Sequence, residues 1–295
     1  MDKSLRPYLA ELIGTFALVF VSAGAVCVNY MAAVAWQPVN PIEPVIVQPQ
    51  PGLTGIALAA GLIYAVLLAA TLSASSGYLN PAIPIMLWVF KKMDTGKAFG
   101  LIFVQAVGAA LAGGLLRLVF SFRDDVLTAA RLGTPHMNAR MFGTGGITPM
   151  VLLSGIGLEL VLTFILTFVI FATLIDTGNR RWVSPWTKRW ACLWAGLTLA
   201  ACTLAAFPVT GAALNPARWF GTVIWEMTIP SLQLQRPFGD QVVYWFGPIA
   251  GSLLAGLVYL MVLVPEETTH AAATAAPASG KVATGAAATL FRSKK

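Results

Sequence analysis

Long apolar stretches alternate along the chain with short polar or proline-rich ones. Each long stretch has about the 20 residues that a helix needs to cross a bilayer. We therefore predict six membrane-spanning helices, at residues 9–30, 52–74, 98–120, 150–175, 190–207 and 242–264. Two further apolar stretches, 81–90 and 216–228, are too short to cross, and each begins inside a copy of the tripeptide Asn-Pro-Ala.

The composition agrees with a membrane protein. Of the 295 residues, 57% are hydrophobic and only 11% are charged, whereas about a quarter of a soluble domain is charged. The mean hydropathy is +0.76. The first apolar stretch is long enough to remain as a span, so we expect no cleavable signal peptide. The expected fold class is an all-α integral membrane protein in contact with lipid.

The formal net charge of +7 does not indicate a nucleic-acid partner, because the basic residues are sorted by side. In a six-span topology one side carries Lys3, Arg6, Lys91, Lys92, Lys97, Arg180, Arg181, Lys188, Arg189, Lys281, Arg292, Lys294 and Lys295. The other side carries Arg123, Arg131, Arg140 and Arg236, with Arg117 near its edge. Cytoplasmic loops hold the basic excess. Both termini are therefore predicted to be cytoplasmic, in a plasma membrane or a bacterial inner membrane.

The cysteines and histidines give no sign of a metal or cofactor site. Cys27, Cys192 and Cys202 lie within spans without ligand spacing, which is typical of packing residues. His136 and His270 fall in a loop and in the C-terminal tail. Convergent nucleophiles and carboxylates are not visible either, so we expect neither a metal, a cofactor nor an enzyme.

An internal repeat organises the chain. Glu-Leu-Ile-Gly-Thr-Phe at 11–16 corresponds to Glu-Leu-Val-Leu-Thr-Phe at 159–164, and the two Asn-Pro-Ala copies follow in the same order. Residues 105–108 are loosely echoed by 246–249. Three spans per repeat give the halves opposite orientations, which is the inverted-repeat plan of many membrane transport proteins. We predict one channel domain at 1–264, with repeats at about 7–120 and 149–264, and a disordered tail at 265–295.

The two tripeptides are predicted to begin half-helices that meet at mid-membrane. They consist of Asn80, Pro81, Ala82, Asn215, Pro216 and Ala217. Asn caps helices and Pro suits the first turn, and each helix N-terminus contributes about half a positive charge. Each Asn side chain is then able to donate to a passing water, interrupting a proton wire, or to act only as a cap. Pro84 lacks the N–H that would close the first intrahelical bond, so the first half-helix is expected to begin irregularly.

These features resemble the major intrinsic protein family, the aquaporins and aquaglyceroporins, over about residues 7–264. The resemblance rests on the paired motifs, on Arg218 directly after the second, and on Glu11 and Glu159 in the first and fourth spans. It implies six helices plus two re-entrant half-helices per pore, usually in a homotetramer. It also implies a passive channel for water, with glycerol, urea or hydrogen peroxide as further solutes, that excludes protons and ions.

The resemblance also assigns roles to particular residues. Ala60, Thr203, Ala212 and Arg218 would form the selectivity filter, and Glu11 and Glu159 would brace the loops before the half-helices. This filter lacks the aromatic residues found in the family, so we expect it to be wide. Trp219, Val223 and the Tyr244-Trp245 pair are nevertheless typical of water channels. Tyr78 replaces a frequent His, so gating attached to that His does not transfer.

Some alternatives remain open at this stage. A secondary transporter shares the inverted repeat, and a non-conducting structural membrane protein can share the fold, because fold does not fix function. Glu11 or Glu159 would then be candidates for proton coupling. The segment 122–146, with His136, is expected to lie over the outer vestibule, where a pH role for His136 is a further hypothesis.

Overall fold

Six long helices make up the body of the protein. The computed structural model describes residues 4–34, 52–175, 190–233 and 236–263, and the predicted tail lies outside these residues. The long helices are α1 (Arg6–Val34), α2 (Gly52–Ser75), α4 (Thr95–Val119), α6 (Pro149–Ile170), α8 (Ala191–Thr210) and α11 (Gln241–Val258). π-Helical turns at Phe171–Ile175 and Tyr259–Leu263 extend α6 and α11. All six are long and apolar enough to cross a membrane, which confirms the predicted spans.

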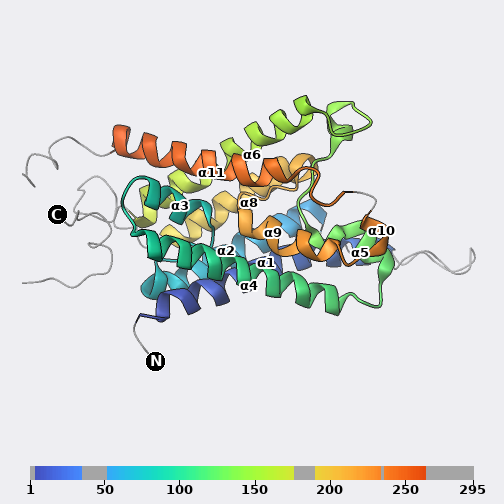
Figure 1. The fold of residues 1–295 in the computed structure, drawn as a ribbon, viewed down its shortest axis with the longest axis horizontal. Coiled ribbons are helices and arrows are strands. Elements are labelled where there is room, and N and C mark those ends of the chain that lie inside the picture. The colour runs from blue at the N-terminus through green and yellow to red at the C-terminus, as the bar shows by residue number, and fades with distance from the viewer. Residues whose placement is uncertain (1–3, 35–51, 176–189, 234–235, 264–295) are drawn as a thin grey trace, which may run out of the picture.

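Two short helices lie between the long ones. They are α3 (Ala82–Val89) and α9 (Pro216–Glu226), and they begin at the two Asn-Pro-Ala motifs. Figure 1 shows the long helices running along the longest axis, with α3 toward one end of the molecule and α9 toward the other. The start of α1 and the end of α11 lie at the end that also holds α3. The predicted half-helices are therefore present, one on each side of the middle.

The remaining helices belong to the segment at the opposite end. It contains α5 (Asp124–Ala130), 3-10 turns at Arg131–Gly133 and Ala139–Phe142, and α10 (Pro230–Gln233). The sequence analysis expected only a loop between 122 and 146. Asp124 and Asp125 in the first turn of α5 favour a helix there, because acidic residues stabilise a helix N-terminus.

The packing of the helices follows the repeat. In each half the first span packs against the second and the third, as α1 does with α2 and α4, and α6 with α8 and α11. The short helices cross over, since α3 packs against α11 and α9 packs against α4. Each half-helix thus lies against a span of the other repeat, which brings the two motifs together.

Glycines allow the closest helix contacts. A Cβ added at Gly108 would collide with the carbonyl oxygen of Leu12, and one at Gly251 with that of Leu160. Leu12 and Leu160 follow the two repeated glutamates, so these contacts are equivalent in the two halves. The structure therefore matches Gly108 with Gly251. The loose sequence match of 105–108 with 246–249 had placed Gly108 opposite position 249, which is two positions earlier. Small residues permit such backbone approach between membrane helices.

Candidate functional site

The backbone before each half-helix turns sharply inside the protein. Left-handed conformations recur in both loops, at Ser76 (φ 78°), Gly77 (63°) and Leu79 (50°), and at Gly211 (76°), Ala212 (47°) and Leu214 (52°). This conformation is unfavourable for a residue with a side chain. Such backbone also leaves N–H groups outside any helix, so other parts of the protein must hold both loops in place.

Glu11 on α1 holds the first of these loops. One carboxylate oxygen accepts from the Ser75 hydroxyl at 2.7 Å and from the Tyr78 N–H at 2.8 Å. The other oxygen accepts from the Leu79 N–H and from the Gln105 side-chain amide, both at 2.7 Å. Glu11 is fully buried, and these four donors account for the cost of placing a carboxylate there.

Glu159 on α6 does the same for the second loop. It accepts from the Thr210 hydroxyl at 2.6 Å and from the N–H groups of Ala213 at 3.0 Å and Leu214 at 2.8 Å. Glu159 is also fully buried. Each glutamate thus accepts hydrogen bonds from the backbone of one loop.

The two asparagines bind each other's loops. The Asn80 side-chain N–H donates to the Leu214 carbonyl oxygen at 2.8 Å, and the Asn215 N–H donates to that of Leu79, also at 2.8 Å. Each side-chain oxygen accepts from the N–H two residues later, so both residues also cap their half-helices. An amide NH₂ has two hydrogens, which leaves one on each Asn for a group in the pore.

The start of α3 differs from that of α9. Pro84 cannot bond to the Asn80 carbonyl, and the Ile83 N–H donates to it instead at 3.1 Å, an i to i+3 bond. In the second half, the Trp219 N–H reaches the Asn215 carbonyl in the α-helical i to i+4 pattern at 3.4 Å. The missing proton of Pro84 thus produces the irregular start that the sequence predicted.

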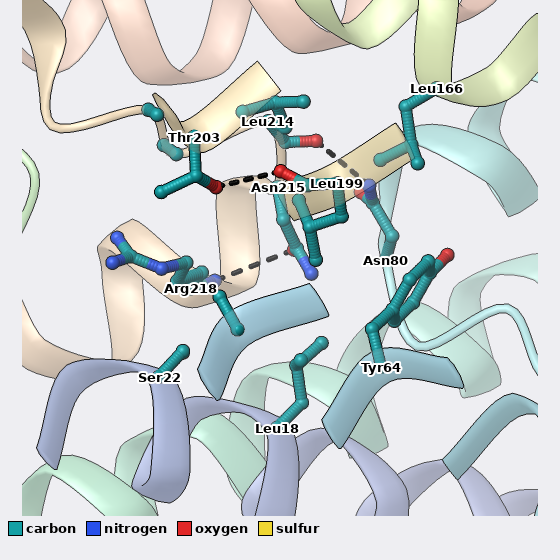
Figure 2. Close-up of a pocket in the computed structure, with 13 residues that line it drawn as sticks. Leu18, Ser22, Tyr64, Asn80, Leu166, Leu199, Thr203, Leu214, Asn215 and Arg218 are labelled. Atoms are coloured by element: carbon teal, nitrogen blue, oxygen red, sulfur yellow. Dashed lines mark hydrogen bonds between the residues drawn. The ribbon is translucent and has the colours of Figure 1, made fainter. Parts of the chain in front are cut away.

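A cavity runs past both asparagines and holds all four predicted filter residues. It is lined by Leu18, Ser22, Ala60, Tyr64, Asn80, Leu166, Leu199, Thr203, Ala212, Ala213, Leu214, Asn215 and Arg218. Figure 2 shows Arg218 and Thr203 toward one end and Asn80 toward the other. The loops, the half-helix N-termini and the guanidinium therefore border one common path.

Arg218 and Thr203 supply polar groups at the same end of the cavity (Figure 2). Arg218 is 6% exposed, and its Nη1 has no hydrogen-bond partner among the described residues. The Thr203 hydroxyl donates to the Leu199 carbonyl at 2.8 Å. Its lone pairs are left to accept from the pore. A molecule in the cavity thus meets a cationic donor and a hydroxyl acceptor.

Comparison with known proteins identifies this arrangement. The family model for the major intrinsic protein family matches residues 1–259. The chain belongs to the major intrinsic protein family. It is 35% identical to aquaporin TIP4-4 of Zea mays, with 86% of this chain and 85% of that one aligned. It is 32% identical to aquaporin AqpM of Methanothermobacter thermautotrophicus, over 85% and 94% of the two chains.

The fold also matches that of a solved relative. The aquaglyceroporin of Plasmodium falciparum superposes with a TM-score of 0.68 at 21% identity, covering 88% of this chain and 96% of that one. At that identity the match is evidence for the fold alone. It supports the six-helix architecture with two half-helices that the sequence predicted.

This major intrinsic protein has pore-lining residues that the sequence analysis missed. They are Leu18, Ser22, Tyr64, Leu166 and Leu199. Helical spacing was the available signal, because residues four apart lie on one face of a helix. Tyr64 follows Ala60 by four positions, and Thr203 follows Leu199 by four.

Trp219 lies outside the cavity despite its place next to Arg218. Its fully buried ring stacks on Tyr244, with ring centroids 5.6 Å apart, and meets Phe238 edge-on at 5.7 Å. The Tyr244 hydroxyl donates to the Thr210 carbonyl at 2.8 Å. Tyr244, with Trp219 stacked on it, therefore holds the residue that precedes the second loop. Trp219 is not among the residues that line the cavity and does not narrow it.

His136 turns away from the cavity into a buried ionic cluster. Its ring nitrogens lie 2.8 Å from a Glu226 carboxylate oxygen and 3.1 Å from one of Asp240. Arg131 also binds Glu226 at 2.8 Å, and the Met137 N–H donates to Asp240 at 2.8 Å. Burial alone would lower the pKa of His136, but the hydrogen bonds and charges of the two carboxylates raise it above its usual value. The cluster fastens the segment 122–146, called the outer segment below, to the C-terminal end of α9 and the N-terminal end of α11.

The outer segment in turn contacts the second loop. The Asn138 N–H donates to the Val209 carbonyl at 2.8 Å. A Cβ added at Gly211 would lie 2.6 Å from the Cα of Pro135. The His136 cluster therefore stabilises the backbone next to the filter without lining the pore itself.

Proposed function

We propose that this protein conducts water together with at least one larger uncharged solute, and excludes protons and ions. Membership of the major intrinsic protein family supports a passive channel for water and small solutes, and members of this family are channels rather than enzymes. Aquaporin names among the relatives and an aquaglyceroporin as a structural neighbour agree with this range. Glycerol, urea and hydrogen peroxide are the solutes to test first.

We infer the exclusion of ions and protons from the groups at the centre of the pore. The N-termini of α3 and α9 and the free amide hydrogens of Asn80 and Asn215 present positive charge and donors to the same path. A water that accepts from these donors turns its hydrogens outward, so a continuous proton wire is interrupted. Arg218, buried in the cavity wall, repels cations at the filter.

The solute range follows from the size of the filter residues. The observation that carries the proposal is the cavity beside Arg218, whose other filter residues are Ala60, Ala212 and Thr203. Two methyl groups and one small hydroxyl leave space for a solute larger than water. Arg218 and Thr203 offer that solute a donor and an acceptor.

The protein is an integral membrane protein, and we propose a plasma membrane or a bacterial inner membrane with both termini cytoplasmic. The start of α1 and the end of α11 lie on one side of the molecule, as this topology requires (Figure 1). Large apolar side chains such as Phe103 and Val66 are exposed on the outer surface, which suits contact with lipid or neighbouring subunits. A homotetramer and a single channel domain at 1–264 complete the proposal.

Stopped-flow measurements on proteoliposomes test this function. Water gradients and at least one of the glycerol, urea and peroxide gradients should drive a non-saturating flux, with no accompanying ion or proton current. Saturable uptake coupled to an ion gradient would instead support a secondary transporter. Correctly folded protein that conducts nothing would support a structural role.

A further inference from the structure

One polar side chain among the residues that line the cavity has no part in the filter or in the bracing of the loops. It is the phenol of Tyr64 on α2, which lines the cavity and is only 2% exposed. Its hydroxyl has no hydrogen-bond partner among the described residues. Buried polar groups are normally hydrogen-bonded. The described residues therefore leave the hydrogen-bonding capacity of this hydroxyl unused.

The position of Tyr64 explains why it matters for selectivity. It lies one helical turn from Ala60, on the same face of α2. Figure 2 shows its ring beside Asn80, at the end of the cavity away from Arg218. Among the residues that line the cavity, Tyr64 has the only aromatic ring. The aromatic ring that the filter lacks is thus present one helical turn away, at the level of Asn80.

We propose that Tyr64 is a specificity-determining residue of this pore. Its ring limits the size of solutes that pass Asn80, and its hydroxyl hydrogen-bonds to them there. Asn80 offers the solute only N–H donors, whereas a phenol both donates and accepts. The solutes that fit are small uncharged molecules carrying hydroxyl or amide groups. The inference deepens the proposed function and depends on it for the identity of these solutes.

Two substitutions separate the ring from the hydroxyl. Tyr64→Phe removes one oxygen and keeps the ring, whereas Tyr64→Leu removes both. Tyr259→Phe is the matched control, because Tyr259 is equally buried but does not line the cavity. Water, urea and glycerol permeabilities are measured in proteoliposomes and divided by the amount of inserted protein. The ratio of solute to water permeability is the readout, because a general loss of packing lowers all fluxes together.

Each substitution has its own expected result. Tyr64→Leu should raise the glycerol-to-water ratio severalfold. Tyr64→Phe should lower the urea and glycerol ratios by roughly two- to tenfold, the effect of one net hydrogen bond. Tyr259→Phe should leave every ratio unchanged. If Tyr64→Leu inserts poorly, Tyr64→Phe decides alone, since the loss of one oxygen preserves the packing.

The outcomes distinguish this inference from the proposed function. Unchanged ratios in both Tyr64 variants would overturn the inference, whatever the unmodified channel conducts. An unmodified channel that conducts water alone would overturn the proposed solute range. If Tyr64→Leu then admitted glycerol, Tyr64 would still be the residue that sets the size limit.

Discussion

Replacing either buried glutamate with Ala should destabilise the folded protein, and the folded fraction should keep its solute selectivity. In Glu11→Ala the N–H groups of Tyr78 and Leu79 lose the carboxylate that accepts from them, and both residues are buried. Each stranded donor costs about 1–3 kcal/mol, so the loop loses about 2–6 kcal/mol. Native proteins have net stabilities of only about 5–15 kcal/mol. The same estimate applies to Glu159→Ala, which strands Ala213 and Leu214.

The conservative variants sharpen this prediction. A Gln at position 11 keeps one acceptor oxygen but places an NH₂ group against donors, so Glu11→Gln should fall between the native protein and Glu11→Ala. The effect should be larger at Glu11 than at Glu159, because Glu11 serves the extra donor Gln105. Asp125→Ala is the control, since this carboxylate pairs with Arg123 at the surface and touches neither loop.

The assay is the yield of monodisperse protein in detergent and its unfolding temperature, followed by flux measurements on the folded fraction. Both Ala variants should lose yield and unfold at lower temperature, while any folded remainder keeps the native ratio of solute to water flux. Normal yield in both variants would refute the bracing role. Normal yield with altered proton coupling would favour the transporter alternative.

Three further predictions follow from the cavity, the glycine contacts and the outer cluster. Combining Ala60→Phe with Thr203→His should suppress glycerol flux more than water flux in proteoliposomes, since a ring narrows the filter, and equal loss of both fluxes would contradict this. Gly61→Ala should destabilise the protein by about 1–3 kcal/mol through overpacking against Gly196 and Ala200, whereas Gly157→Ala, where a Cβ meets nothing within 4 Å, should not lower the unfolding temperature. The folded pKa of His136 is raised, so its stabilisation of residues 131–140 is complete below the unfolded pKa of about 6.5 and is lost as the pH rises through the folded value. Protection factors at 131–140, which divide out the intrinsic pH dependence of amide exchange, should then fall, and His136→Gln should remove this fall.

The sequence predicted the fold well because each feature had a local physical cause. Spans of sufficient length must be helices in a bilayer, and Asn followed by Pro specifies a helix start. The irregular start of α3 was likewise predictable from one residue, Pro84, which has no N–H. In each case the relevant atoms lie close together in the chain.

The lining of the pore was harder to predict, because it depends on contacts between distant residues. The partners of His136 lie 90 and 104 positions away, so the sequence placed this residue over the vestibule, although its ring faces Glu226 and Asp240. Tyr64 lay inside an apolar span, where its spacing of four from Ala60 was the one local signal that it shares a face with a predicted filter residue. Its role became visible only when α2 was placed beside Asn80.

The two repeats differ at the points where selectivity is expected. The glutamate contacts and the reciprocal asparagine bonds occur in both halves. They hold the two half-helix N-termini together at the centre of the pore, where we propose that ions and protons are excluded. Arg218 has no counterpart in the first half, where Ile83 follows the motif. Ala60 and Tyr64 belong to α2, and Thr203 belongs to α8, its partner in the repeat. Changes at the symmetric positions should therefore affect folding, and changes at the asymmetric positions should affect which solutes pass.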